Sequence, residues 1–231
     1  MTNKFPHTLE GQLARYAMAV SNFNNIPEDD AQGEISSALA DLVEVRQNVV
    51  GLANTFEERF DAYRHAVWYQ DADPEASFAD ALGNRILETK SNFDGWFEVY
   101  RFANENQTVL AESLEQSGSP LLNLSAQDSN WMKMYDEFRD EKSDIFTRLA
   151  FLLRDTGGNF SVPNLANIYI ASASRIAAND TKEQRFIFGQ AQRRLGNWLG
   201  YNMSFHDFKT IFNASSNVGE IGSELKKKAL D

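Results

Sequence analysis

Apolar residues recur every three or four positions along most of this chain, and the longest such series lies in its first third. The positions are Ile35, Leu39, Leu42, Arg46, Val49, Ala53, Phe56, Phe60, Tyr63 and Val67, of which only Arg46 is unsuited to a core. This spacing lines one face of a helix and suits packing against another helix. Because Pro27 and the carboxylates after it favour a helix start, the pattern predicts one long helix over about residues 27–70.

Shorter amphipathic stripes fill most of the remaining chain. They span residues 9–23, 78–86, 93–114, 131–152, 165–176 and 187–199. Thr181 and Gln184 have the spacing of a capping box before the last of these. Alternation with a period of two, which would indicate a strand, is not sustained anywhere. The sequence therefore predicts an all-α fold, an elongated helical bundle with one long helix in its first half.

One segment with turn-forming residues divides the chain. Ser117-Gly118-Ser119-Pro120 is typical of a loop, and we expect the loop to cover residues 117–129. Its leucines, Leu121, Leu122 and Leu124, would then need a surface to dock on. This gives a long-helix half at 1–116 and a C-terminal helical half at 130–231, together forming one structural unit.

The composition and charge limit the classes of function that the chain can have. The net charge is −11 and the pI about 4.8, so the surface repels nucleic acid at long range but leaves room for a local basic groove. Cysteine is absent, which excludes disulfides and thiol chemistry. The first residues lack the apolar stretch of a signal peptide, and no apolar run is long enough to span a membrane. We expect a protein that is not secreted and that lies in the cytoplasm or in a virion.

The sequence offers little for catalysis or for a metal. The three His are far apart and lack metal-ligand spacing, so we predict no metal, no cofactor and no enzyme activity. One alternative stays open. Arg59 and His65 have the loose spacing of ribonucleases of the HEPN type, in which Arg would hold a phosphate and His would move a proton.

The segment Thr181–Gly200 carries a second line of residues beside its apolar stripe. Phe186, Gln190, Arg193 and Asn197 follow one another at helical spacing, with Arg185 and Arg194 on the flanks. An aromatic ring followed by donors could stack a base and hold phosphates. It could equally be an exposed helix face with one apolar contact to a neighbour. The predicted nucleic-acid contacts are Arg175, Arg185, Phe186, Arg193 and Arg194, and Arg154 could add to the same groove.

Four segments resemble parts of viral coat proteins. Val99-Tyr100-Arg101-Phe102 resembles a segment of the tobacco-mosaic-type coat proteins, and so do Asp140–Ser143 and the later Phe151–Gly157, in the same order. Leu165–Gly200 is similar to the late helices of flexuous filament coat proteins. The resemblance implies a helical coat subunit that winds around single-stranded RNA, in which assembled arginines bind the RNA and carboxylates repel across the subunit interface.

These observations lead to a first hypothesis and two alternatives. The first is a non-enzymatic, self-assembling structural protein, a viral helical capsid or nucleocapsid subunit that coats single-stranded nucleic acid as a homo-oligomer or helical polymer. The second is an acidic helical regulator, from a phage or a bacterium, that binds a basic partner. The third is the HEPN-like ribonuclease that would use Arg59 and His65.

Overall fold

A computed structural model describes residues 5–27, 32–75, 77–138, 145–156, 164–165, 167–169, 171–172 and 181–199. Every regular element in these ranges is a helix, so the predicted all-α class is confirmed. The chain divides into two compact units, Met1–Ser113 (unit 1) and Leu114–Asp231 (unit 2). Within the described ranges, every helix falls short of the combined length and apolarity that crossing a bilayer requires.

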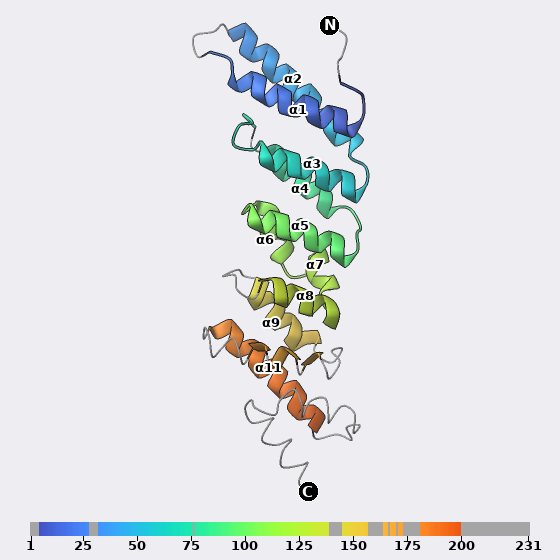
Figure 1. The fold of residues 1–231 in the computed structure, drawn as a ribbon, viewed down its shortest axis with the longest axis vertical. Helices are drawn as coiled ribbons and strands as arrows, with labels where there is room; N and C mark the ends of the chain where they lie inside the picture. Colours follow the sequence, from blue (N-terminus) through green and yellow to red (C-terminus); the bar gives the residue numbers. More distant parts are fainter. Residues whose placement is uncertain are drawn as a thin grey trace. The chain divides into compact units, whose positions relative to one another are not determined.

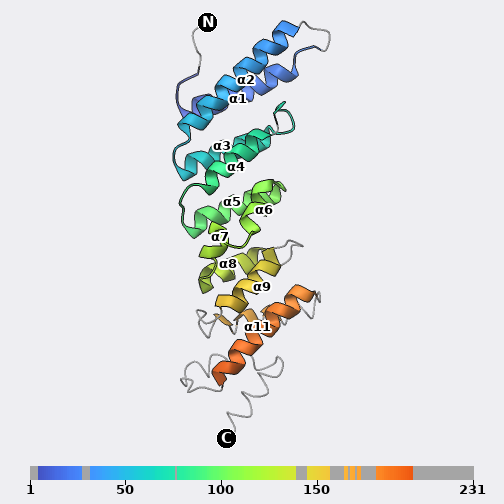
Figure 2. The ribbon, with the colours of Figure 1, turned by 180° about the vertical axis from the view of Figure 1, so that it is seen from behind.

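Unit 1 is built from helices that pack against their successors in the chain. α1 (Leu9–Asn24) packs against α2 (Gln32–Leu52), and α3 (Phe56–Trp68) packs against α4 (Ser77–Leu87). α5 (Phe93–Glu105) follows, and α6 (Val109–Glu115) begins in unit 1 and ends beyond its boundary. Figures 1 and 2 show these helices one after another along unit 1.

Aromatic rings hold α5 against α3. The ring centroids of Phe56 and Trp96 are 5.0 Å apart, and those of Tyr63 and Phe102 are 5.9 Å apart. The hydroxyl of Tyr63 also donates to Thr108 Oγ1 at 2.6 Å, which ties α3 to the start of α6. Large side chains therefore make the core continuous from one helix pair to the next.

The predicted long helix over 27–70 is wrong, because the chain forms two helices there. α2 ends at Leu52, and Thr55 caps the start of α3. The Thr55 hydroxyl accepts a hydrogen bond from the Glu58 backbone N–H at 3.2 Å. The Glu58 carboxylate in turn accepts from the backbone N–H groups of Thr55 and Asn54, each at 2.9 Å. This capping box satisfies donors that a continuous helix would have used internally, and the two backbone hydrogen bonds lower the pKa of Glu58.

Most of the long apolar stripe is buried inside unit 1. Its residues lie on both sides of the break, and Leu42, Val49, Ala53, Phe56, Tyr63 and Val67 are all in the core. Leu39 is 38% exposed and is joined one turn later by Val43 at 46%, which lies beside the stripe. Unit 1 therefore covers nearly all of this surface itself and leaves one apolar turn of α2 open.

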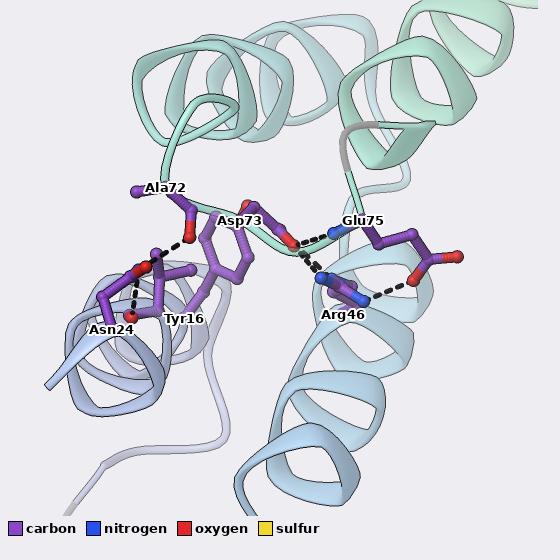
Figure 3. A network of polar contacts seen from close by, with 7 residues as sticks. Tyr16, Asn24, Arg46, Ala72, Asp73 and Glu75 are labelled. Atoms are coloured by element: carbon purple, nitrogen blue, oxygen red, sulfur yellow. Dashed lines mark hydrogen bonds and ion pairs between the residues drawn. The ribbon is translucent and has the colours of Figure 1, made fainter. Parts of the chain in front are cut away.

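Arg46, the one charged residue in the stripe, is buried in an ion pair (Figure 3). Its guanidinium pairs with the carboxylate of Asp73, whose side chain is 1% exposed, and reaches Glu75 as well. Asp73 also accepts from the Tyr16 hydroxyl at 2.5 Å and from the Glu75 backbone N–H at 2.9 Å. Nearby, the Asn24 side chain donates to the carbonyl of Ala72 at 2.6 Å. This network joins α1 and α2 to the connection between α3 and α4.

Unit 2 is centred on α9 (Ile145–Thr156), which packs against three other helices. They are α7 (Pro120–Leu124), α8 (Asp128–Phe138) and α11 (Lys182–Leu199). The indole N–H of Trp131 donates to the Leu149 carbonyl at 2.9 Å, and the Tyr135 hydroxyl donates to the Gln184 side chain at 3.1 Å. Before α11, the Thr181 hydroxyl accepts from the Gln184 backbone N–H at 3.2 Å, as the spacing of these two residues predicts.

The predicted loop over 117–129 contains a helix, α7, and the first two residues of α8. Ser119 caps α7 by accepting from the Leu122 backbone N–H at 3.2 Å, and Pro120 occupies the first turn, where its missing N–H costs nothing. Leu121 and Leu122 are buried, so these leucines dock inside unit 2.

Candidate functional site

The charge of the chain is unevenly distributed between the two units. Unit 1 contains 8 Lys and Arg against 19 Asp and Glu, so it carries the whole net charge of −11; unit 2 contains 14 of each and is neutral. Within unit 2, helices α9 and α11 hold six basic residues and two acidic ones, Asp155 and Glu183. The basic residues are Arg148, Arg154, Lys182, Arg185, Arg193 and Arg194. This helix pair is therefore a local basic region in an acidic protein.

Two phenylalanines stand exposed on this helix pair. Phe151 on α9 is 39% exposed and Phe186 on α11 is 37% exposed, and their ring centroids lie 5.8 Å apart in an edge-to-face arrangement. Other residues of the two helices are buried, among them Leu149, Leu153, Ile187 and Ala191. The two rings lie beside these buried positions and are partly open to solvent.

Cationic groups lie on the same two helices as the rings. The Arg154 guanidinium lies 4.9 Å from the centre of the Phe151 ring. Arg194 donates from Nη2 to the backbone carbonyl of Arg154 at 2.5 Å, which fixes α11 to the end of α9. Lys182 and Arg193 are both exposed on α11. We call Phe151, Phe186 and the six basic residues of these two helices the α9–α11 surface.

Two hollows adjoin the Phe151 ring. The smaller, of about 190 Å³, is lined by Thr147, Ala150, Phe151, Lys182 and Phe186. The larger, of about 340 Å³, is a cleft between α9 and the segment 117–123. Its α9 wall consists of Arg148, Phe151, Leu152 and Arg154, and the other wall of Ser117, Gly118, Leu122 and Asn123.

The wall opposite α9 has a defined shape. The Asn123 side chain donates to the Gly118 carbonyl at 3.0 Å. Gly118 has a φ of +87°, a conformation that residues with a side chain rarely adopt. The turn and the oriented amide give this wall polar groups, while Leu122 adds an apolar floor.

The structure brings together part of the predicted nucleic-acid site. Phe186, Arg185 and Arg193 are exposed on α11, and Arg194 is half-buried against Arg154. Arg175 lies outside the described residues.

The prediction missed three residues, Arg148, Phe151 and Lys182. The signal available for α9 was the spacing of Arg148, Phe151 and Arg154 at intervals of three residues, beside the apolar stripe rather than on it.

Arg59 and His65, the residues of the ribonuclease alternative, both contact backbone carbonyl groups of unit 1. Arg59 donates to the backbone carbonyls of Arg85 at 2.6 Å and Ala53 at 3.3 Å, so its guanidinium joins helix ends. His65 Nδ1 lies 3.0 Å from the Asp61 carbonyl. This geometry does not present the guanidinium to a phosphate and gives the ribonuclease hypothesis no support. Among the described residues, no group of three or more His, Asp or Glu is placed to hold a metal ion.

Comparisons with protein-family models, curated proteins and solved structures find no match to this chain.

Proposed function

We propose that this chain is a non-enzymatic structural protein that binds single-stranded nucleic acid through the α9–α11 surface, as a helical capsid or nucleocapsid subunit. The observation that supports it is the exposed pair of rings, Phe151 and Phe186, on a basic helix pair, with the Arg154 guanidinium over the Phe151 ring. Proteins that hold single strands combine aromatic platforms for bases with basic groups that follow the phosphates. This surface supplies both on two helices that pack against each other.

The aromatic rings favour a single strand over a duplex. Stacking on Phe186 requires the face of a base, and a duplex presents only base edges in its grooves. The basic groups serve either form, because phosphate contacts carry no sequence information. A preference for single strands is therefore the property that separates this function from general polyanion binding.

The apolar surface available for assembly of copies along the strand is smaller than the long apolar stripe predicts. Most of the stripe is covered within unit 1, and the part of it that stays open for contact with another copy is Leu39, with Val43 one turn later on α2. An acidic unit 1 repels other copies of itself, and binding a polyanion to unit 2 does not relieve that repulsion. Copies would therefore associate through apolar contacts, and more strongly at high salt.

Fluorescence anisotropy with a labelled, unstructured RNA oligonucleotide tests the binding. Phe186→Ala should weaken binding by about 1–3 kcal/mol, the usual loss for one stacked base, or about 5- to 150-fold in Kd. The double variant Lys182→Gln/Arg193→Gln should also lower the steepness of the salt dependence, by about 0.7 for each phosphate that no longer meets a cation. A matched control is Arg101→Gln on α5, which removes an exposed arginine from unit 1.

The proposal fails if the wild-type protein does not bind the RNA, or if a matching duplex binds as tightly as the single strand. It fails equally if Phe186→Ala binds the RNA as tightly as the wild type and the Arg101→Gln control do. Sedimentation velocity tests the assembly. With RNA present, Leu39→Glu should reduce large species, and a wild-type protein that stays monomeric on RNA at all salt concentrations would refute a capsid role.

A second candidate function follows from unit 1 alone. Its charge of −11 and its 61% exposed Trp68, in contact with His65 and Phe102, favour a regulator that binds a basic protein segment. A cation can lie over a Trp ring, and nearby carboxylates would add to the attraction. Titration with a Lys/Arg-rich peptide should quench Trp68 fluorescence in the wild type. If this is the function, Trp68→Ser abolishes peptide binding, and the wild-type protein itself does not bind RNA.

A further inference from the structure

We propose that the cleft between α9 and the segment 117–123 receives one nucleotide of the bound strand, with its base against Leu122, Phe151 and Leu152 and its phosphate beside Arg148 or Arg154. This inference rests on the proposed function and adds to it a defined ligand, a nucleoside monophosphate unit, at a defined place. It also predicts that the protein binds free mononucleotides.

The size of the cleft fits one nucleotide. Its volume of about 340 Å³ is at the lower end of the range for small-molecule sites, about 300–1,000 Å³. A single base with its ribose and phosphate is a ligand of that scale, whereas a dinucleotide is not. The neighbouring hollow of about 190 Å³ is too small for a whole nucleotide and can at most cover one face of a base.

The walls offer both an apolar surface and cationic groups, which a nucleotide needs for its base and its phosphate. Leu122 and Leu152 with the Phe151 ring give an apolar surface for a planar base. Arg148 and Arg154 border that surface, and a guanidinium can bind a phosphate through two parallel hydrogen bonds. A ligand with both an apolar ring and an anionic group therefore fits better than either part alone.

The opposite wall can contact the edge of the base. Because the Asn123 amide nitrogen donates to the Gly118 carbonyl, the orientation of the amide is fixed. Its oxygen accepts hydrogen bonds, and the Ser117 hydroxyl can both donate and accept. These groups favour a base whose hydrogen-bonding edge is unpaired, which again is a property of single strands.

The Phe151 ring connects the cleft to the rest of the α9–α11 surface. It lines the cleft and the smaller hollow, and Phe186 lines the smaller hollow as well. A strand that places one base in the cleft can therefore lay the adjacent base on Phe186. The cleft would set the register of the strand, and the exposed cations would follow its phosphates.

Isothermal titration with uridine 5′-monophosphate, uridine and inorganic phosphate tests this directly. The monophosphate should bind, and uridine or phosphate alone should bind at least about tenfold more weakly, since each makes only part of the contacts. Ser117→Trp and Asn123→Trp, both at exposed rim positions, each fill the cleft and should abolish mononucleotide binding. Arg148→Gln should weaken it without filling the cleft, and circular dichroism checks that each variant is folded.

The same variants separate this inference from the proposed function. Blocking the cleft should weaken binding of the RNA oligonucleotide by several-fold only, because Phe186 and the outer cations remain. Phe186→Ala should weaken oligonucleotide binding more than mononucleotide binding, because Phe186 lines the smaller hollow and not the cleft. If the oligonucleotide binds and the mononucleotide does not, or if both Trp variants and Arg148→Gln bind mononucleotide like the wild type, the cleft assignment is refuted alone. If neither ligand binds, the proposed function is refuted with it.

Discussion

Removing the buried Arg46 should be among the most destabilising substitutions in unit 1. In Arg46→Met the Asp73 carboxylate, with a side chain 1% exposed, keeps the Tyr16 hydroxyl and the Glu75 N–H as donors but loses its cation. Breaking a buried ion pair in this way costs about 3–5 kcal/mol, because the remaining charge is left uncompensated in the interior. The two donors that remain place the expected loss near the lower end of that range.

Urea unfolding followed by circular dichroism measures the loss. With a slope of about 1–3 kcal/mol per M, a loss of about 3 kcal/mol lowers the midpoint by about 1–3 M. The matched control is Arg15→Met. Arg15 also pairs with two carboxylates, Asp41 and Glu44, but their side chains are 43% and 62% exposed. Exposed pairs contribute about 0–1 kcal/mol, so the control should lower the midpoint far less.

A double-mutant cycle tests whether the two residues act as a pair. Asp73→Asn alone should also destabilise, and the double variant Arg46→Met/Asp73→Asn should lose less than the sum of the single changes. The coupling energy should lie within the range for residues in contact, about 0.5–3 kcal/mol. If Arg46→Met lowers the urea midpoint no more than Arg15→Met does, or if the single effects simply add, the buried ion pair does not stabilise unit 1 as expected.

Three further predictions follow from unit 1. Thr55→Ala removes the acceptor of the Glu58 N–H and should cost about 1 kcal/mol in urea unfolding, while Thr55→Ser should not; equal losses would count against the capping box. Burial raises the pKa of Tyr16 and of Tyr63 to about 12, so the folded state keeps both phenols neutral. The stability that this contributes is complete below about pH 10, the ordinary pKa of tyrosine, and is lost as the pH rises toward 12. The loss is up to about 3 kcal/mol for each tyrosine. Urea unfolding of Tyr63→Phe should show a smaller alkaline loss than the wild type, and an unchanged loss would contradict the assignment. A Cβ at Gly11 would lie 2.4 Å from the Pro6 carbonyl oxygen, whereas one at Gly51 would meet nothing within 4 Å. In thermal unfolding, Gly11→Ala should therefore be destabilised by about 1–3 kcal/mol and Gly51→Ala stabilised by about 0.5–1 kcal/mol. The reverse order of stability would contradict the packing at these two glycines.

The sequence predicts the fold class well because helical periodicity is a local property of the chain. It does not predict the break after Leu52, because the apolar spacing continues in phase across Ala53 and Phe56, on both sides of the interruption. The Thr55–Glu58 capping pair was the signal that a new helix starts there. Ser119-Pro120 had the same ambiguity, since these residues begin a helix as readily as they form a loop.

The candidate site was only partly predictable. The face of α11 with Phe186 and Arg193 could be read from spacing, but its pairing with Phe151 depends on how α9 packs against α11. The partner of Arg46 was hidden for the same reason. Asp73 lies 27 residues away along the chain, and only tertiary packing brings the two together.

The consecutive packing of helices in unit 1 also bears on how the protein folds. Because α1 meets α2 and α3 meets α4, the search for native partners spans only short stretches of chain, and such low contact order is typical of rapid folding. Each helix pair that forms early would leave apolar residues exposed until the next pair packs against it. The Arg46–Asp73 ion pair would form only when the second pair packs against the first. That late step would act as a check on alignment, since a pair docked out of register would bury a guanidinium with no counterion.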